Sequence, residues 1–125
     1  MEITIKDKTY PLKASFAFLR EMEIKNKRTV KGDETMDFGL ADAIIQVREV
    51  GDLRYLVDLL AALNIGQKPR LEKSMIEAYL EDECEDIESL IDEVLNFLYK
   101  ANVCRLRLKK FDLIPTQKEE TKTKE

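Results

Sequence analysis

Histidine is absent from the 125-residue sequence, and its absence removes several kinds of chemistry. Without an imidazole the chain has no Ser-His or Cys-His nucleophile and no histidine metal site, and it lacks the commonest general base. The four glycines are scattered singly, so neither a P-loop nor a GxGxxG phosphate cradle is present. Residue chemistry therefore points away from an enzyme and predicts no cofactor.

Cysteine is also scarce, with only Cys84 and Cys104 in the chain. Two distant cysteines without CxxC spacing do not form a disulfide scaffold or a zinc site, which favours a reducing cytoplasm. The acidic run at 81–88 offers carboxylates for a hard cation. It lacks the spacing and the glycine of an EF-hand loop, so a solvated helix junction is the favoured interpretation and no metal is predicted.

No apolar run approaches the ~20 residues that a membrane helix needs, and the charged N-terminus does not resemble a signal peptide. Net charge is −4 and the pI is about 5.1, which does not favour nucleic acid or an anionic membrane as a partner. Basic residues near Lys25–Lys31 and Arg105–Lys110 leave a small nucleic-acid-binding regulator as a minor alternative. The composition, 44% hydrophobic and 37% charged, indicates one globular domain.

The N-terminal 23 residues change from a strand period to a helix period. Ile3 and Ile5 alternate with polar residues, and a second short strand follows the polar break at Asp7–Lys8, which predicts a β-hairpin. Ser15 is a plausible N-cap for a helix that extends to about Lys27. Because a lone hairpin is marginal in water, it is expected to lie on the helices downstream.

The middle of the chain predicts a long loop and then two helices. Residues 26–34 are polar and contain the turn signal Gly32–Asp33. A helix begins near Asp37 and ends at Gly51, and Asp52 caps the next helix, so the two should form an αα-hairpin.

The third helix is apolar on two sides. One side is a normal core stripe. The second stripe is Tyr55, Leu59 and Ala62. We hypothesise that it is a partner-binding surface; the alternative is that the hairpin or the first helix covers it.

Two more helices follow, and the end of the chain is ambiguous. Ser74–Glu77 fits a capping box before a short helix to about Glu83, and Asp86 starts the clearest helix of the chain. Residues 104–109 fit either a helix or a strand. The predicted fold is α+β and mostly α: one domain over 1–111, with the hairpin packed on a bundle of about five helices, and a disordered charged tail over 112–125.

The order of these elements resembles the tail assembly chaperones of long-tailed phages and prophages of Gram-positive bacteria. The similarity spans Met1 to about Lys110. It is carried by Ile3–Ile5, Lys8, Tyr10, Leu12–Lys13, Phe16, Phe18, Leu19–Met22, Phe38–Leu40, Leu53–Leu63, Ile76–Leu80, Asp86–Glu88, Leu90 and Asp92–Leu95.

This resemblance implies a non-enzymatic protein that binds the tape measure protein, keeps it soluble and assists polymerisation of the tail tube protein around it. It also implies residence in the host cytoplasm and absence from the mature virion. Because many copies are needed to cover a long tape, self-association is expected. A generic helical protein-interaction adaptor is the main alternative.

Overall fold

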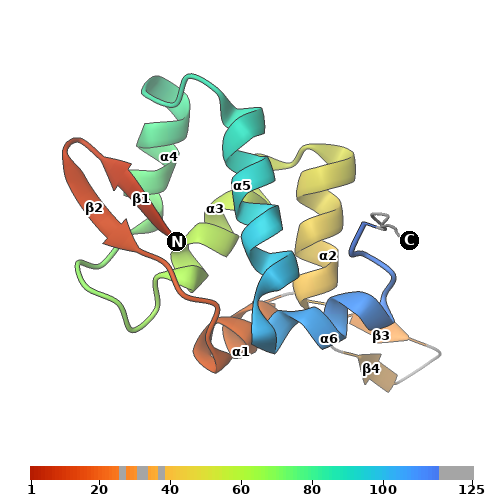
Figure 1. Cartoon of the computed structure of the whole chain (residues 1–125). Helices are drawn as coiled ribbons and strands as arrows, with labels where there is room; N and C mark the ends of the chain where they lie inside the picture. The colour runs from red at the N-terminus through yellow and green to blue at the C-terminus, as the bar shows by residue number, and fades with distance from the viewer. Residues whose placement is uncertain (26–27, 31–33, 37–38, 116–125) are drawn as a thin grey trace, which may run out of the picture.

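The computed structural model describes residues 1–25, 28–30, 34–36 and 39–115. In these ranges a bundle of helices carries one small hairpin beside α4 and a second at the opposite lower corner (Figure 1), which confirms the predicted mostly helical α+β fold. The elements are β1 (Glu2–Ile5), β2 (Lys8–Pro11), α1 (Phe16–Lys25), β3 (Arg28–Val30), β4 (Glu34–Met36), α2 (Gly39–Ile45), the π-helical turn η1 (Gln46–Val50), α3 (Leu53–Leu63), α4 (Lys73–Asp82), α5 (Ile87–Lys100) and α6 (Asn102–Lys110).

The predicted N-terminal hairpin is present as the antiparallel pair β1–β2. Ile3 pairs with Tyr10, and both side chains are buried because alternate residues of each strand face the helices. The connecting residues Lys6 and Asp7 have φ values of 50° and 67°, the left-handed backbone that a two-residue hairpin turn requires. Burial of one apolar face on the bundle stabilises a hairpin that would be marginal alone.

The prediction of a loop at 26–34 is wrong for the residues that the structure describes there, because β3 and β4 form a second antiparallel hairpin. Thr29 pairs with Thr35 in a ladder of three residue pairs. Three-residue strands are too short to show a clear alternation of apolar and polar residues, and the residues around them in the sequence are polar. The turn signal Gly32–Asp33 lies outside the described residues.

Two glycines and one cap shape the connection from α1 to α3. A Cβ on Gly39 would overlap the backbone carbonyl of Met22 and lie 2.7 Å from Glu23 Cα, so only glycine lets α2 approach α1 this closely. Gly51 (φ 77°) ends η1, and the carboxylate of Asp52 accepts from the backbone N–H of Arg54. The predicted tight junction between these helices is confirmed, since α2, η1 and α3 contact one another.

The start of α4 differs from the prediction. The helix begins at Lys73 with Glu72 as the N-cap residue, so Ser74 does not form the predicted capping box. Leu71 is fully buried, and its N–H donates to Asn64 Oδ1 at 2.6 Å. This tertiary anchor turns the chain into the helix earlier than the local signal indicates.

The C-terminal part of the described chain forms two helices, α5 and α6, separated by one extended residue. Asp86 caps α5 as predicted by accepting from Ser89 N, and extended Ala101 (ψ 132°) separates α5 from α6. Residues 104–109 are therefore helical. Leu113, two residues beyond the predicted end of the domain at 111, is buried in the hydrophobic core. The rest of the predicted tail, 116–125, lies outside the described residues.

Candidate functional site

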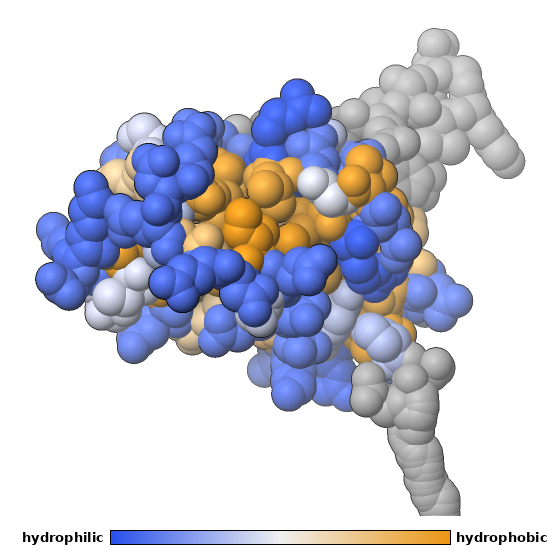
Figure 2. Space-filling view, turned by 90° about the horizontal axis from the view of Figure 1, so that it is seen from above, coloured by the Kyte–Doolittle hydropathy of each residue, from blue (hydrophilic) through white to orange (hydrophobic). Residues whose placement is uncertain are grey.

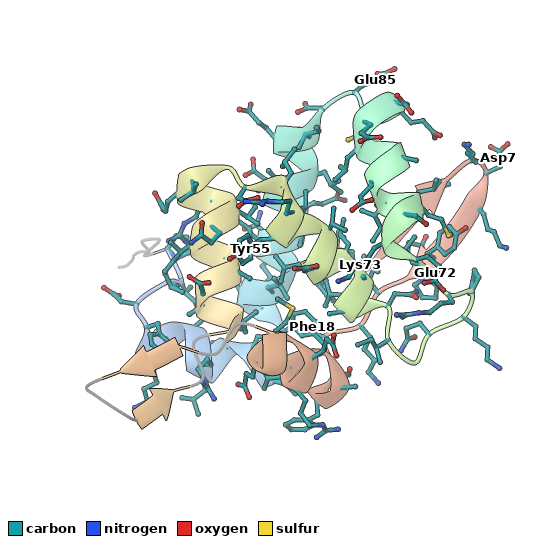
Figure 3. All side chains as sticks on the ribbon, turned by 180° about the vertical axis from the view of Figure 1, so that it is seen from behind. Asp7, Phe18, Tyr55, Glu72, Lys73 and Glu85 are labelled. Atoms are coloured by element: carbon teal, nitrogen blue, oxygen red, sulfur yellow. The ribbon has the colours of Figure 1, made fainter. Side chains whose placement is uncertain are left out.

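The structure covers most of the stripe that the sequence offered as a contact surface. Leu59 is 0% exposed and Ala62 is 2% exposed. Tyr55, which is labelled in Figure 3, is half-buried. Phe18 of α1 is fully buried, and α1 packs against α3. Leu59 and Ala62 therefore belong to the hydrophobic core of this chain. A partner contact through Tyr55 stays a prediction.

An open apolar surface lies elsewhere, between α3, α4, α5 and η1. Two depressions of about 340 and 640 Å³ meet at Leu53, which lines both. Seen from above, an apolar area on this face is enclosed by hydrophilic side chains (Figure 2). We call the joined depressions the apolar cleft; its apolar lining includes Leu53, Val57, Leu80, Ile87 and Ile91.

Local helix geometry places acidic residues along two sides of the cleft. Glu77 and Glu81 are four residues apart on α4, and Glu88 and Asp92 are four apart on α5, so each pair shares a helix face. All four are exposed. Within the described residues none of these carboxylates takes part in an ion pair. We call them the acidic rims; they give the cleft a negative border.

The two arginines at the cleft already have partners in the chain. Arg54 donates to both carboxylate oxygens of Asp52, at 3.0 and 2.8 Å, and these side-chain hydrogen bonds lower the pKa of Asp52. Arg48 donates to Glu49, to Tyr99 and to the backbone carbonyl of Leu113. Neither cation is left to neutralise the acidic rims.

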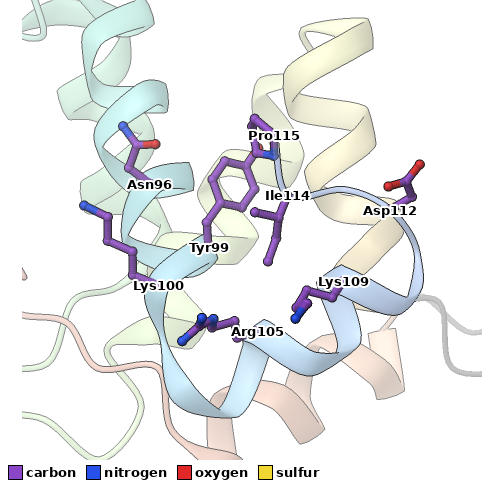
Figure 4. A pocket seen from close by; sticks show the side chains of 8 residues that line it. All are labelled: Asn96, Tyr99, Lys100, Arg105, Lys109, Asp112, Ile114 and Pro115. Carbon is purple, nitrogen blue, oxygen red and sulfur yellow. The ribbon is translucent and has the colours of Figure 1, made fainter. Parts of the chain in front are cut away.

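A separate depression of about 800 Å³ lies beside α6 and has the opposite charge. Lys100, Arg105 and Lys109 line it together with Tyr99 and the segment that carries Ile114 and Pro115 (Figure 4). Tyr99 and Pro115 also line the cleft, so the end of the described chain separates the basic depression from the apolar cleft.

Two other kinds of site were searched for over the described ranges. They contain no group of three or more Cys, Asp or Glu side chains placed to hold a metal ion. In the same ranges, each helix is too short or too polar to cross a bilayer. The acidic run at 81–88 spans the end of α4, the α4–α5 junction and the start of α5.

Sequence patterns alone do not identify the cleft. Ile87 and Ile91 follow the same period as the buried residues of α5, so the period alone does not distinguish them from core residues. The signal in the sequence was that α4 and α5 each carry two acidic residues four positions apart, next to apolar positions. Only the arrangement of α3 relative to α4 and α5 shows that these apolar residues remain open.

Fold and cleft together define a small, mostly helical protein with an open apolar cleft. A family model described as phage tail assembly chaperone protein, TAC, matches residues 2–112. The chain therefore belongs to the phage tail assembly chaperone family, as its resemblance indicated. No curated protein and no solved structure matches it.

Proposed function

We propose that this chain binds the tape measure protein of a long-tailed phage through the apolar cleft and keeps it soluble. Membership of the chaperone family supports a role in tail assembly. The observation that carries the proposal is the half-buried apolar floor formed by Leu53, Ile87 and Ile91 between the acidic rims. A continuous apolar depression on a small protein is typical of an interaction site.

The cleft fits the chemistry of a long helical client. An amphipathic helix exposes apolar side chains at i, i+3, i+4 and i+7, and an apolar groove shields them from water. The acidic rims favour a helix whose apolar stripe is flanked by Lys or Arg, because opposite charges steer and orient the partner. Since the floor is shallow and only half-buried, binding is expected to be reversible, which displacement during assembly requires.

The rest of the proposed role concerns assembly of the tail around the bound tape measure protein. Held by many copies, the tape measure protein stays available while tail tube subunits polymerise around it. The chaperone leaves before the tail is complete. Its work is done in the host cytoplasm by binding alone, without a catalysed reaction.

Co-expression with segments of the phage's tape measure protein tests the proposal. The wild-type chain should raise the soluble fraction of the segment and co-purify with it. The double substitution Leu53→Ser and Ile91→Ser should weaken binding roughly tenfold or more, because both anchors lose apolar area. Thermal unfolding of the variant checks that the fold is kept.

Matched variants make the result specific. Phe16→Ser removes a comparable apolar side chain from α1, where Phe16 is 62% exposed, and should bind as wild type does. Glu81→Lys with Glu88→Lys alters only exposed rim residues and should also weaken binding. An insoluble client in the presence of wild type, or full binding by a folded cleft variant, contradicts the proposal; the former favours a generic adaptor.

A further inference from the structure

The outer surface of α5 changes charge along its length. Four exposed residues that recur every four positions form one ridge on this surface. They are Glu88, Asp92, Asn96 and Lys100. In the part of the chain that the structure describes, the three charged members of the ridge take part in no ion pair. The ridge therefore offers a partner negative charge at one end and positive charge at the other.

The two ends of the ridge border two different depressions. Glu88 and Asp92 line the apolar cleft, whereas Lys100 lines the basic depression beside α6. The two depressions are adjacent, because three residues line both of them: Asn96, Tyr99 and Pro115. We call the apolar cleft and the basic depression together the long groove.

The basic end of the long groove is built from α5 and α6. Arg105 and Lys109 of α6 line it together with Lys100 of α5 (Figure 4), and over the described ranges these cations are not neutralised by ion pairs. Among the described residues of this lining, Asp112 is the single carboxylate, so the cations outnumber it. Because opposite charges orient a partner, this end is suited to Asp or Glu side chains, whereas the acidic rims are suited to Lys or Arg.

We propose that the long groove binds one client helix whose charge changes along its length. Lys or Arg beside its apolar stripe faces Glu88 and Asp92, and Asp or Glu further along the helix faces Lys100 and its neighbours. Glu88 and Lys100 are about 18 Å apart along α5, so the two charged parts of the client are separated by about three helical turns. The inference rests on the proposed function, because it requires that the cleft binds a client helix, and it deepens that function by specifying the charge pattern of the client.

The order of the charges also determines the direction of the client helix. Acidic side chains stabilise the first turn of a helix and basic side chains stabilise the last turn, since they complement its dipole. A client with this order places its C-terminal Lys or Arg near Glu88 at the start of α5, and its N-terminal Asp or Glu near Lys100 at the end of α5. The client therefore lies antiparallel to α5.

Three synthetic amphipathic peptides test the charge pattern with the full chain. All three have the same apolar stripe and Lys in the C-terminal turns; the N-terminal turns carry Glu, Gln or Lys. Fluorescence anisotropy should show that the Glu peptide binds roughly fivefold more tightly than the Gln peptide, and that the Lys peptide binds most weakly. A client held by the acidic rims alone gives the opposite order, because added positive charge then strengthens binding.

A charge-reversal variant and a matched control locate the effect. Lys100→Glu with Arg105→Glu changes exposed residues of the basic depression and should make the Lys peptide the tightest of the three. Lys13→Glu with Arg20→Glu makes the same change in net charge at exposed positions outside both depressions, and should keep the wild-type order. Thermal unfolding checks that both variants are folded.

A nitroxide label at the C-terminus of the Glu peptide tests the direction. In NMR spectra it should broaden the amide signal of Ser89, at the start of α5, more than that of Ala101, which follows its end. Stronger broadening at Ala101 contradicts the antiparallel direction.

The outcomes distinguish this inference from the proposed function. Binding of the Gln peptide without tighter binding of the Glu peptide, or an equal loss of the order in the Lys13 and Arg20 control, overturns the inference alone. Failure of all three peptides to bind overturns both the inference and the binding of helices by the cleft.

Discussion

Asn64 is the polar residue on which the hairpin, α3 and the loop before α4 depend. It is 0% exposed, and its amide nitrogen donates to the carbonyls of Pro11 and Pro69 at 3.0 and 3.1 Å. Its amide oxygen accepts from Leu71 N. Asn64→Leu keeps the volume but leaves these buried groups unpaired, so it should lower the free energy of unfolding by about 2–5 kcal/mol, measured by urea denaturation.

An exposed asparagine provides the control for this prediction. Asn96→Leu on α5 removes an amide that water already solvates and should change stability by less than about 0.5 kcal/mol. Equal effects of the two substitutions would show that the Asn64 hydrogen bonds contribute no more to stability than those of an exposed asparagine. The sequence marks Asn64 only as a helix stop, because its partners lie 5 to 53 residues away along the chain.

The two cysteines differ in burial and should differ in reactivity. Cys104 is 0% exposed, and this burial raises its pKa to about 12, whereas Cys84 is half-buried. At pH 8, thiol labelling should modify Cys84 rapidly and Cys104 only after unfolding, because the thiolate is the reactive form. Cys84→Ser should abolish the fast phase; two fast thiols in the native chain would contradict the buried position of Cys104.

The same shift gives a pH dependence with a defined sign. Below pH 9.0, the ordinary thiol value, Cys104 is protonated in both the folded and unfolded chains and does not alter stability. As pH rises from there toward about 12, only the unfolded chain ionises, which favours the unfolded state, so the free energy of unfolding falls. Cys104→Ala should make the decline above pH 9.0 less steep in urea titrations.

Among the elements, the segment that follows α6 is joined to the rest of the bundle by side-chain hydrogen bonds from one residue, Arg48. Arg48 of η1 donates to Tyr99 Oη at 2.8 Å and to the Leu113 carbonyl at 2.9 Å, so it joins η1, α5 and the C-terminal segment. Arg48→Met should loosen the segment and the end of α6 while sparing the core. Trypsin should then cleave after Lys109 and Lys110 several-fold faster than in wild type, because proteolysis requires local opening.

Arg54→Met is the matched control for the arginine. The Arg54 side chain is 89% exposed and pairs with Asp52 two residues away, so its loss should leave the cleavage rate at α6 unchanged. Cleavage at equal rates in wild type and Arg48→Met would show that Leu108 and Leu113 alone hold the segment.

Elements with strong local signals were predictable from sequence. The period of α5 and the caps at Asp52 and Asp86 were found because their determinants lie within one or two helical turns. The β3–β4 hairpin was missed because each strand has only three residues. The start of α4 was misplaced because a buried anchor at Leu71, and not the local Ser74 signal, positions the helix.

For the whole molecule, the sequence showed that α3 is apolar on two sides but not which surface stays open. Leu59 follows the same spacing as a contact residue would, yet it is completely buried. Ile91 follows the spacing of a core residue, yet it lines the cleft. Exposure is a property of how helices meet, so it cannot be derived from the period of a single helix.

The acidic rims lead to a prediction about how the whole molecule holds its client. The rims lie on two sides of the apolar floor, so added salt should weaken binding of a tape measure segment that carries Lys or Arg beside its apolar stripe. Glu81→Lys with Glu88→Lys should weaken binding and remove most of this salt dependence. The measurement is titration of a fluorescent tape segment at low and high salt. Equal binding by the rim variant and wild type at both salt concentrations would place the client on a different surface.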